Sequence, residues 1–436
     1  MTGPIAAQHR RPGFTAYAGW FLAAAFFFYA WILRVSPSVM VEQLMRDFAV
    51  SGAVLGNLSA FYFYAYAGLQ MPVGLALDRW GPRRVLSIAV LGAGAGCLIF
   101  AAAPSVEVAY LGRTLIGAGA AFGLVGSMVL AGAWFPPRRF ALLSGSAMAL
   151  GLTGGIVGQG PMAVLVEGAG WRASIAYLGI GALVLAVLTW AFTRDRPTAG
   201  AEVPAATADA YDDGVLRALW RVARRPQTVA IALYAGFASS PMLAFGALWG
   251  VPYTMTAYGI GRPAAGFATS FLLLGFVIGS PLWGWISDRI GLRKPPALLG
   301  TALAGAALTV ALWVPGLSFD LYRALLFLTG FGVGAMVVCY ALTREHNARG
   351  GTGAALGLVN MLAVAGGAVF QPVVGLLLDL GWDGVMAAGA RVYSIEAYRA
   401  AFLTLPALFA LAFVSTLLIR ETRCRPVETA AASAAA

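Results

Sequence analysis

The sequence predicts an all-α integral membrane protein with twelve transmembrane helices in two six-helix repeats. Only 11% of the 436 residues are charged and 60% are hydrophobic, whereas a soluble domain carries roughly 25% charged residues. Twelve apolar runs are each long enough to cross a hydrocarbon layer, which takes about 20 helical residues. The pattern Gly-x-x-x-Asp-Arg-x-Gly-x-Arg-(Arg or Lys) occurs at 74–84 and again at 284–294. Two such copies, about half a chain apart, indicate a tandem duplication.

The apolar runs give the expected membrane spans in order. In the first half we expect spans at 14–40, 52–77, 84–103, 106–133, 140–166 and 171–192. In the second half we expect spans at 227–257, 263–286, 296–315, 321–343, 352–378 and 397–419. Glycine and proline inside these runs are compatible with helices, because neighbouring helices in a membrane can satisfy the freed backbone groups. The first run is longer than a signal-peptide core and no small-residue cleavage pattern follows it, so we expect it to be retained.

The connection between the two sets of six runs divides the chain. It combines prolines, Ala and Thr, an Asp-Asp pair and then four arginines, which is typical of a solvated linker followed by a short interfacial basic helix. The last residues are rich in alanine and lack periodicity, so we expect them to be disordered. The predicted organisation is an N-terminal six-helix half at 1–192, a cytoplasmic linker at 193–226, a C-terminal six-helix half at 227–420 and a disordered cytoplasmic tail at 421–436.

The positive charges predict the orientation of the spans. Most of the 29 Arg and Lys residues lie in alternate connections, namely the amino terminus, 79–84, 138–139, 194–225, 289–294, 344–349 and the tail from 420. By the positive-inside rule both termini are cytoplasmic. The net charge of +11 does not indicate nucleic-acid binding, because the chain has no basic domain with interleaved aromatic residues. Lys294 is the only lysine, and this preference for arginine suggests a GC-rich genome and hence a bacterial inner (plasma) membrane.

The repeated loop contains aspartates whose position is unusual. Asp78 and Asp288 end helices at the cytoplasmic face, where the negative end of the helix dipole disfavours a carboxylate that lacks a positive partner. The glycine-rich start of the eleventh span, 349–353, offers backbone N–H groups to such a carboxylate. We therefore predict that Asp78 contacts this helix start or the neighbouring arginines, with topogenic charge as the alternative. The candidate residues of the two loops are Asp78, Arg79, Gly81, Arg83, Arg84, Asp288 and Arg289.

Two six-helix halves with this loop after the second helix of each resemble the major facilitator superfamily of secondary transporters. In the fourth span, Arg113-Thr-Leu-Ile-Gly117-Ala-Gly119 is similar to the family pattern R-x-x-x-G-x-G. The resemblance implies two halves that alternate around a site at mid-membrane. It also implies that the candidate residues of the two loops are gating residues, and that the Asp78 contact is a latch that holds the cytoplasmic side shut. The Gly-Pro motif of drug/proton antiporters is incomplete: Gly160-Pro161 is present, but Val164 and Leu165 replace the glycines. That departure disfavours an efflux pump.

Arg34 is the leading candidate for substrate contact. It lies about 20 residues into the first span, hence ~30 Å along the helix, and a charge inside the membrane costs at least ~2.5 kcal/mol. The alternative is an arginine that reaches to the outer head groups. Tyr29-x-x-x-x-Arg34 resembles the first helix of organophosphate and organic-anion permeases, in which an arginine contacts the anionic substrate. Their second arginine, in the seventh span, is absent from 239–244. Other segments resemble amino-acid and dipeptide permeases.

Further candidate residues are aromatic or amide side chains inside apolar spans. Tyrosines or aromatic residues four apart share a helix face, and a buried amide without a partner costs a few kcal/mol. Helix–helix packing and hydrogen bonding are the alternatives for each. Besides Arg34, the predicted substrate contacts are Tyr29, Tyr62, Tyr66, Trp249, Tyr253, Asn360 and Gln371. Arg113 has two open roles, namely structural support through carbonyls of a neighbouring helix and coupling.

We expect a secondary active or facilitative transporter that moves a small carboxylate-bearing solute (an organic anion, amino acid or dipeptide) by alternating access. No acid or histidine is expected at mid-membrane, so facilitated diffusion, exchange and co-transport of a protonated substrate stay open. The alternatives are an efflux pump for amphipathic compounds and a membrane sensor. An enzyme is not expected, since membrane chemistry needs embedded His or acid clusters.

The expected partners are the small-molecule substrate and the lipid bilayer, and we expect a monomer. The three cysteines, Cys97, Cys339 and Cys424, are neither even in number nor closely spaced, so they indicate neither a disulfide framework nor a metal site. We therefore expect no cofactor and no metal.

Overall fold

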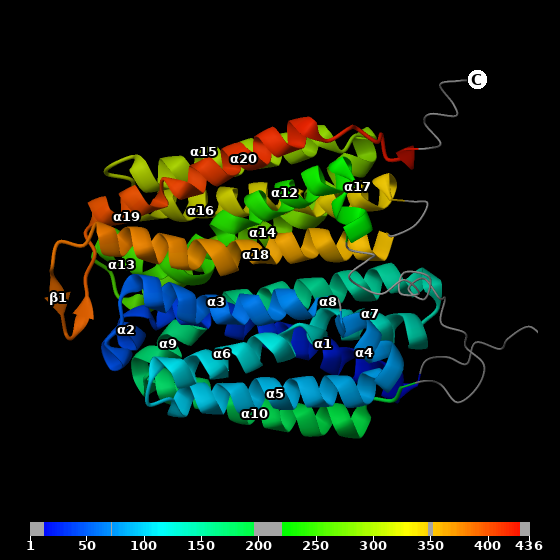
Figure 1. Cartoon of the computed structure of the whole chain (residues 1–436), viewed down its shortest axis with the longest axis horizontal. Helices are drawn as coiled ribbons and strands as arrows, with labels where there is room; N and C mark the ends of the chain where they lie inside the picture. Colours follow the sequence, from blue (N-terminus) through cyan, green and yellow to red (C-terminus); the bar gives the residue numbers. More distant parts are fainter. Residues whose placement is uncertain (1–12, 71, 196–219, 348–351, 428–436) are drawn as a thin grey trace, which may run out of the picture.

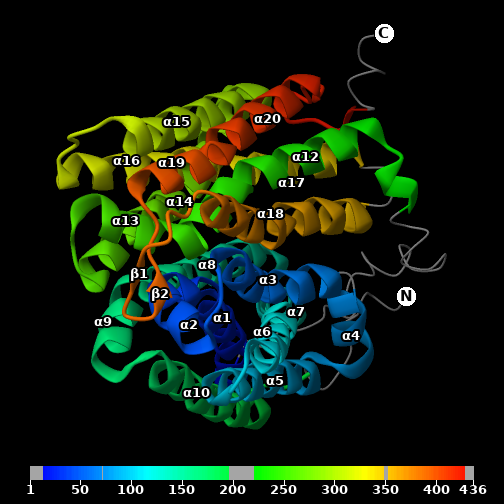
Figure 2. The same ribbon diagram turned by 60° about the vertical axis from the view of Figure 1, so that its left-hand side comes forward.

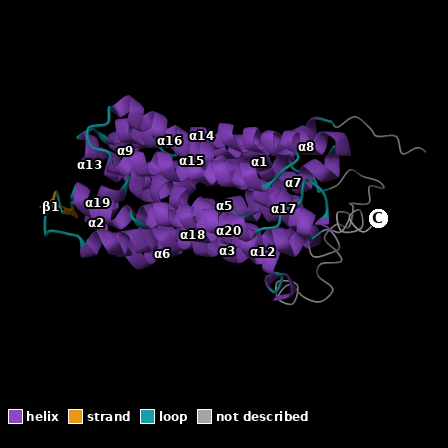
Figure 3. Cartoon of the chain, turned by 90° about the horizontal axis from the view of Figure 1, so that it is seen from above, coloured by secondary structure: helices purple, strands orange, loops and turns teal. Residues whose placement is uncertain are grey.

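The computed structural model describes residues 13–70, 72–195, 220–347 and 352–427, and these are almost entirely helical (Figures 1 and 3). By length and apolarity, 11 helices in these ranges are able to cross a membrane, or 12 if the bent pair of α2 and α3 counts as one span. The predicted fold class is confirmed. Each of the twelve expected spans coincides with one helix or with a short series of helices.

The first six spans are built from ten α-helices and one 3-10 turn. In chain order they are α1 (Phe14–Val35), η1 (Ser36–Val39), α2 (Val41–Phe48), α3 (Gly52–Leu69), α4 (Pro72–Trp80), α5 (Pro82–Ala102), α6 (Val106–Ala120), α7 (Phe122–Trp134), α8 (Pro137–Val157), α9 (Gly160–Ala169) and α10 (Trp171–Phe192).

The second six spans also contain two irregular helical segments. In chain order they are α12 (Pro226–Pro241), the π-helix η3 (Met242–Trp249), α13 (Gly250–Tyr258), α14 (Arg262–Ile290), α15 (Lys294–Trp313), α16 (Phe319–Val333), the 3-10 turn η4 (Gly334–Val337), α17 (Val338–His346), α18 (Thr352–Leu380), α19 (Ile395–Phe402) and α20 (Thr404–Leu418). A two-residue hairpin, β1 (Met386–Ala387) and β2 (Ala390–Arg391), lies between α18 and α19.

Several expected spans are broken where the sequence disfavours a continuous helix. The run predicted at 52–77 divides before Pro72, and the run at 140–166 divides before Pro161, because proline lacks the N–H that an interior position needs. The seventh span changes to a π-helix directly after Pro241. The short helix α2 is bent by 111° from α3.

The two halves lie side by side, and both Figure 1 and Figure 2 show α18 next to α3 at their boundary. We call the end of the bundle that contains α4 and α17 the inner end. The end that contains α2, α13 and the hairpin is the outer end (Figure 1). α1 starts at the inner end, and α10 and α20 finish there, as the predicted topology requires. Most of the predicted linker, 196–219, and the end of the tail, 428–436, lie outside the described residues.

Candidate substrate site and gates

Arg34 lies in the last turn of α1 and is only 5% exposed. Its guanidinium carbon is 4.3 Å from the centre of the Trp31 ring and 4.7 Å from that of Tyr66. Its Nε donates to the Tyr62 hydroxyl at 3.4 Å. None of the ion pairs among the described residues includes Arg34. The first span therefore carries a buried cation that aromatic rings surround and that no carboxylate in the described part of the chain neutralises.

α3 supplies the aromatic side of this site. Tyr62 and Tyr66 lie on one face of α3, and their rings stack at a centroid distance of 5.9 Å. Tyr62 donates its hydroxyl proton to the Ala30 carbonyl at 3.3 Å, which ties α3 to α1. The predicted residues Arg34, Tyr62 and Tyr66 thus come together, and Trp31 joins them without having been predicted.

Two side chains of the second half and Gln70 of the first half form a hydrogen-bonded series that begins near Arg34. Tyr340 on α17 interacts electrostatically with Arg34 and Tyr66. Its hydroxyl donates to Asn360 Oδ1 at 3.0 Å, and Asn360 Nδ2 donates to Gln70 Oε1 at 2.8 Å. Gln70 Nε2 is buried and has no hydrogen-bond partner in the part of the chain that is described. Asn360 was predicted; Tyr340 and Gln70 were missed, although each is a polar residue in or beside an apolar run.

Arg113 on α6 packs against the Tyr62 ring. It is 1% exposed, and its two terminal nitrogens donate to the Leu33 carbonyl at 2.9 Å and to the Ser59 carbonyl at 3.2 Å. Its guanidinium carbon lies 5.1 Å from the Tyr62 ring centre. These bonds join α6 to α1 and α3, as the structural role of Arg113 requires.

Four predicted contacts lie away from Arg34. The Tyr29 hydroxyl is 3.3 Å from Cys97 Sγ and donates to the Leu178 carbonyl, toward α5 and α10. Trp249 Nε1 donates to the Gln371 carbonyl at 3.0 Å, and Gln371 Nε2 donates to the Leu243 carbonyl at 2.8 Å. The Tyr253 hydroxyl donates to the Leu312 carbonyl. All four side chains join helices to one another, which is the alternative that the sequence left open.

The carboxylate of Asp195 binds the backbone of the first repeated loop, a contact that the sequence motif did not indicate. Gly81 has a φ of 78°, and the backbone N–H of Arg83 donates to Asp195 Oδ1 at 2.7 Å. Arg83 Nε donates to the Trp190 carbonyl at 2.8 Å. The side chains of Asp78, Arg79 and Arg84 are exposed. Residues 348–351, most of the predicted partner of Asp78, lie outside the described residues.

The second repeated loop forms a charge network at the inner end. Arg293 pairs with Asp288 at 2.6 Å and with Glu345 at 2.7 Å, whereas the predicted Arg289 is exposed. Glu421 accepts the backbone N–H groups of Arg293 at 3.0 Å and Lys294 at 2.8 Å.

The start of the predicted tail therefore docks on this loop instead of extending from the protein. Burial acts to raise the pKa of the Glu421 carboxyl, but the backbone N–H donors of Lys294 and Arg293 outweigh it and leave the pKa below its ordinary value.

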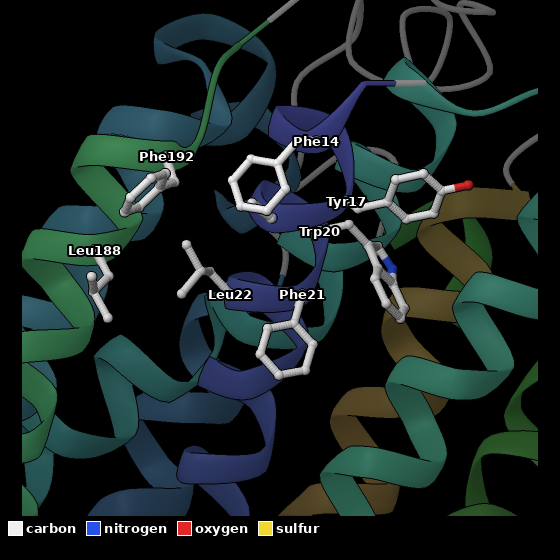
Figure 4. A pocket seen from close by; sticks show the side chains of 8 residues that line it. Phe14, Tyr17, Trp20, Phe21, Leu22, Leu188 and Phe192 are labelled. Atoms are coloured by element: carbon white, nitrogen blue, oxygen red, sulfur yellow. The ribbon is translucent and has the colours of Figure 1, made fainter. Parts of the chain in front are cut away.

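A separate pocket of about 500 Å³ lies at the inner end of α1, facing α10 (Figure 4). Its lining is almost entirely carbon, and the Tyr17 hydroxyl beside it already accepts a hydrogen bond from Arg139 at 2.7 Å. The lining residues are Phe14, Tyr17, Ala18, Trp20, Phe21, Leu22, Leu188 and Phe192. This pocket offers nothing to a polar solute, so the candidate site stays at Arg34.

The model of the Major Facilitator Superfamily matches residues 20–251 and again residues 240–435. The chain belongs to the Major Facilitator Superfamily. It is thus a multi-pass membrane protein of a transporter family, and the resemblance inferred from its loops and its fourth span is confirmed. The match in two segments agrees with the two six-helix repeats.

Curated relatives include transporters of organic acids and a sensor. The chain is 25% identical over 65% of its length to a probable sulfoacetate transporter, SauU, of Cupriavidus necator, of which the match covers 69%. It is 23% identical over 65% of its length to a putative tartrate transporter of Agrobacterium vitis, of which the match covers 67%. It is also 27% identical over 89% of its length to the membrane sensor protein UhpC of Salmonella typhimurium, of which the match covers 90%.

Among solved structures, the fold is similar to that of a bacterial homologue of the human lysosomal transporter Spinster in an inward-facing and unoccupied conformation. The TM-score is 0.74 at 17% sequence identity, and the match covers 93% of this chain and 98% of that one. The likeness establishes the fold.

Proposed function

We propose that this transporter carries a small organic anion with a carboxylate group, by alternating access, and that Arg34 binds the carboxylate. The observation that carries the proposal is the burial of Arg34 without an acidic partner among the described residues. A charge inside the membrane costs at least ~2.5 kcal/mol. Cation–π contacts with Trp31 and Tyr66 offset part of this cost. A bound anion would offset the remainder.

The surroundings of Arg34 suit a solute with a second polar group. The guanidinium presents a planar pair of donors that matches a carboxylate. Gln70, which Asn360 and Tyr340 link toward Arg34, has a buried Nε2 donor without a partner in the described ranges. The names of the organic-acid relatives support this substrate class. We further propose that the protein lies in a bacterial inner membrane with both termini in the cytoplasm, as its Arg and Lys distribution predicts.

Uptake by purified protein in proteoliposomes tests the proposal. Tartrate and sulfoacetate serve as anionic probes, with erythritol as a neutral comparator and choline as a cationic one. We expect uptake of an anion only. Arg34→Ala abolishes that uptake with expression intact, and Arg34→Lys raises the apparent KM at least tenfold, because lysine keeps the charge but loses the planar fork.

Arg323→Ala is the matched control, since Arg323 lies at the outer surface and pairs with Asp320 in its own helix. This variant should transport like the wild type. Full transport by Arg34→Ala, or choline uptake in place of anion uptake, would overturn the proposal and favour an efflux pump for amphipathic compounds.

The likeness to a membrane sensor over most of the chain favours one other function. A sensor would bind an anion at Arg34 without moving it. Saturable, Arg34-dependent binding by calorimetry, together with no flux or exchange in proteoliposomes, would select the sensor.

A further inference from the structure

The first turn of α3 receives its cap from the other half of the protein. α3 begins at Gly52, and the side chain of Ser51 makes no capping hydrogen bond to it. Instead, the Gly52 N–H donates to Asp379 Oδ1 at 2.9 Å, and the Ala53 N–H donates to Asp379 Oδ2 at 2.8 Å. Both oxygens of one carboxylate thus bind the N-terminus of a helix more than 300 positions away in the chain.

Asp379 is held for this role by two neighbours from its own half. The Tyr393 hydroxyl donates to Asp379 Oδ1 at 2.6 Å and accepts the Gly52 N–H at 3.0 Å. Arg391, beside the hairpin turn, pairs with Asp379 at 3.0 Å. The side chain of Asp379 is only 13% exposed, so solvent screens these contacts weakly.

The contact between Asp379 and the start of α3 forms only when the two halves lie close together at the outer end. Asp379 lies in the last turn of α18, where the helix dipole disfavours a carboxylate, while the start of α3 attracts one. If the outer ends separated, Asp379 would lose both N–H donors and keep the unfavourable field of its own helix. The contact therefore stabilises only the conformation in which the outer end is closed.

From this contact, α3 and α18 pack antiparallel toward the inner end. A side chain on Gly52 would collide with Gly375, and one on Gly56 would collide with Gln371. Further inward, Gln70 bonds with Asn360. Beyond that pair the close packing ends among the described residues, since a side-chain atom built on Gly74 has nothing within 4 Å.

We propose that Asp379 is the outer latch of this carrier: it closes the outer end by capping α3 and releases α3 when the outer end opens. The proposal rests on the alternating-access function above.

A second contact also crosses the outer end. Arg262 pairs with Glu42 at 3.1 Å, but the Glu42 side chain is 50% exposed. The pair borders a pocket of about 240 Å³ that reaches Arg391 and Tyr393. An exposed ion pair contributes little. The buried carboxylate with two backbone donors is therefore the contact that decides closure.

The test measures the distance between the outer ends by double electron–electron resonance, without substrate. Spin labels on Glu167→Cys and Asp320→Cys report on α9 of the first half and α16 of the second. Cys424→Ser removes a partly exposed native cysteine, whereas Cys97 and Cys339 are buried. We expect Asp379→Ala to raise the ratio of outward-open to inward-open molecules roughly tenfold, as the loss of charge-assisted hydrogen bonds implies, and Asp379→Asn to raise it less.

Asp383→Ala is the matched control, because Asp383 lies in the same outer loop and accepts the Val385 N–H within its own turn. It should leave the distances unchanged. Tyr393→Phe removes one hydroxyl and should shift the ratio in the direction of Asp379→Ala, which provides a milder variant if the alanine protein is unstable.

Unchanged distances in folded Asp379→Asn and Tyr393→Phe would overturn the latch, as would equal opening by Asp383→Ala. Because no substrate is added, these results are separate from the anion proposal. If the protein shows no flux but the distance at its outer end still changes in the Asp379 variants, the latch proposal stands and the carrier proposal fails.

Discussion

Two buried arginines act on one tyrosine ring in different ways. Arg113 donates to carbonyls of α1 and α3, so backbone groups satisfy two of its nitrogens and hold it in place. Arg34 donates to the Tyr62 hydroxyl and lies over aromatic faces. Tyr62 lies between them, with guanidinium carbons 5.5 and 5.1 Å from its ring centre. Arg113 thus holds α6 to α1 and α3, and Arg34 is the cation to which the proposed function assigns the carboxylate.

Gly117 shows how closely backbones must approach around this site. A methyl group on Gly117 would fall on the carbonyl of Tyr62, so we expect Gly117→Ala to push α6 away from α3. Overpacking of this kind costs about 1–3 kcal/mol. The melting temperature in detergent and the anion uptake should both fall. Gly181→Ala is the matched control, since nothing lies within 4 Å of that position; an equal loss in both variants would contradict the packing argument.

At the scale of elements, the duplication reaches further than the repeated loop. α10 ends at Phe192 and α20 at Leu418, and the third residue beyond each end is an acid, Asp195 or Glu421. Each acid returns to the N-terminal end of the third span of its own half, at the backbone N–H groups of Arg83 or of Arg293 and Lys294. The last span of each half is thereby clamped to the loop that carries the repeated motif.

The clamp at Glu421 predicts a pH-dependent stability. Its carboxyl has a pKa below the ordinary value because backbone N–H donors outweigh its burial. A group with a depressed folded pKa stabilises the protein above its unfolded pKa, and this stability is lost as the pH falls through the folded value. We expect Glu421→Gln to cost about 1 kcal/mol at neutral pH, since the group is half-exposed. The difference in melting temperature from the wild type should shrink as the pH falls below the ordinary Glu pKa of about 4.3, and it should vanish below the lower folded pKa.

Glu396→Gln provides the control, because Glu396 is exposed in the first turn of α19. Its effect should be small at both pH values. A difference between Glu421→Gln and wild type that persists undiminished at acid pH would contradict the clamp.

At the scale of the whole molecule, the titratable groups surround the transport path without entering its middle. In the ranges that the structure describes, every aspartate, glutamate and histidine lies near a helix end or in a connection. The buried charges near the site are instead Arg34 and Arg113, which remain protonated at physiological pH. A side-chain proton is therefore not part of the proposed cycle.

This distribution predicts transport that is insensitive to protons. For an anion whose charge is constant between about pH 5.5 and 7.5, counterflow exchange in proteoliposomes should be nearly flat over that range. An imposed proton gradient should not drive accumulation. If a gradient does drive uphill uptake and the drive survives His346→Ala, the first candidate for the proton site is Glu42, which now pairs with Arg262 at the outer end.

The sequence by itself determined the spans, the duplication and the buried cation. A run of about 20 apolar residues has few fates other than a membrane helix, so all twelve spans appear near their expected limits. Arg34 could be found because a charge in such a run is costly wherever its helix packs. The aspartate–arginine loops were found because local spacing alone defines them.

Only the tertiary structure decided which side chains meet. In lipid, the face of a helix that packs and the face that meets the membrane are both apolar, so hydrophobic periodicity does not reveal the rotation of a helix. Tyr29, for example, lies only five positions before Arg34 in the sequence, but its side chain points to Cys97 and not to that arginine. Asp379, Asp195 and Glu421 bind backbone N–H groups far away in the chain, and any exposed helix start offers the same groups. The way distant helices pack decides which helix start each carboxylate reaches. No local sequence pattern encodes that packing.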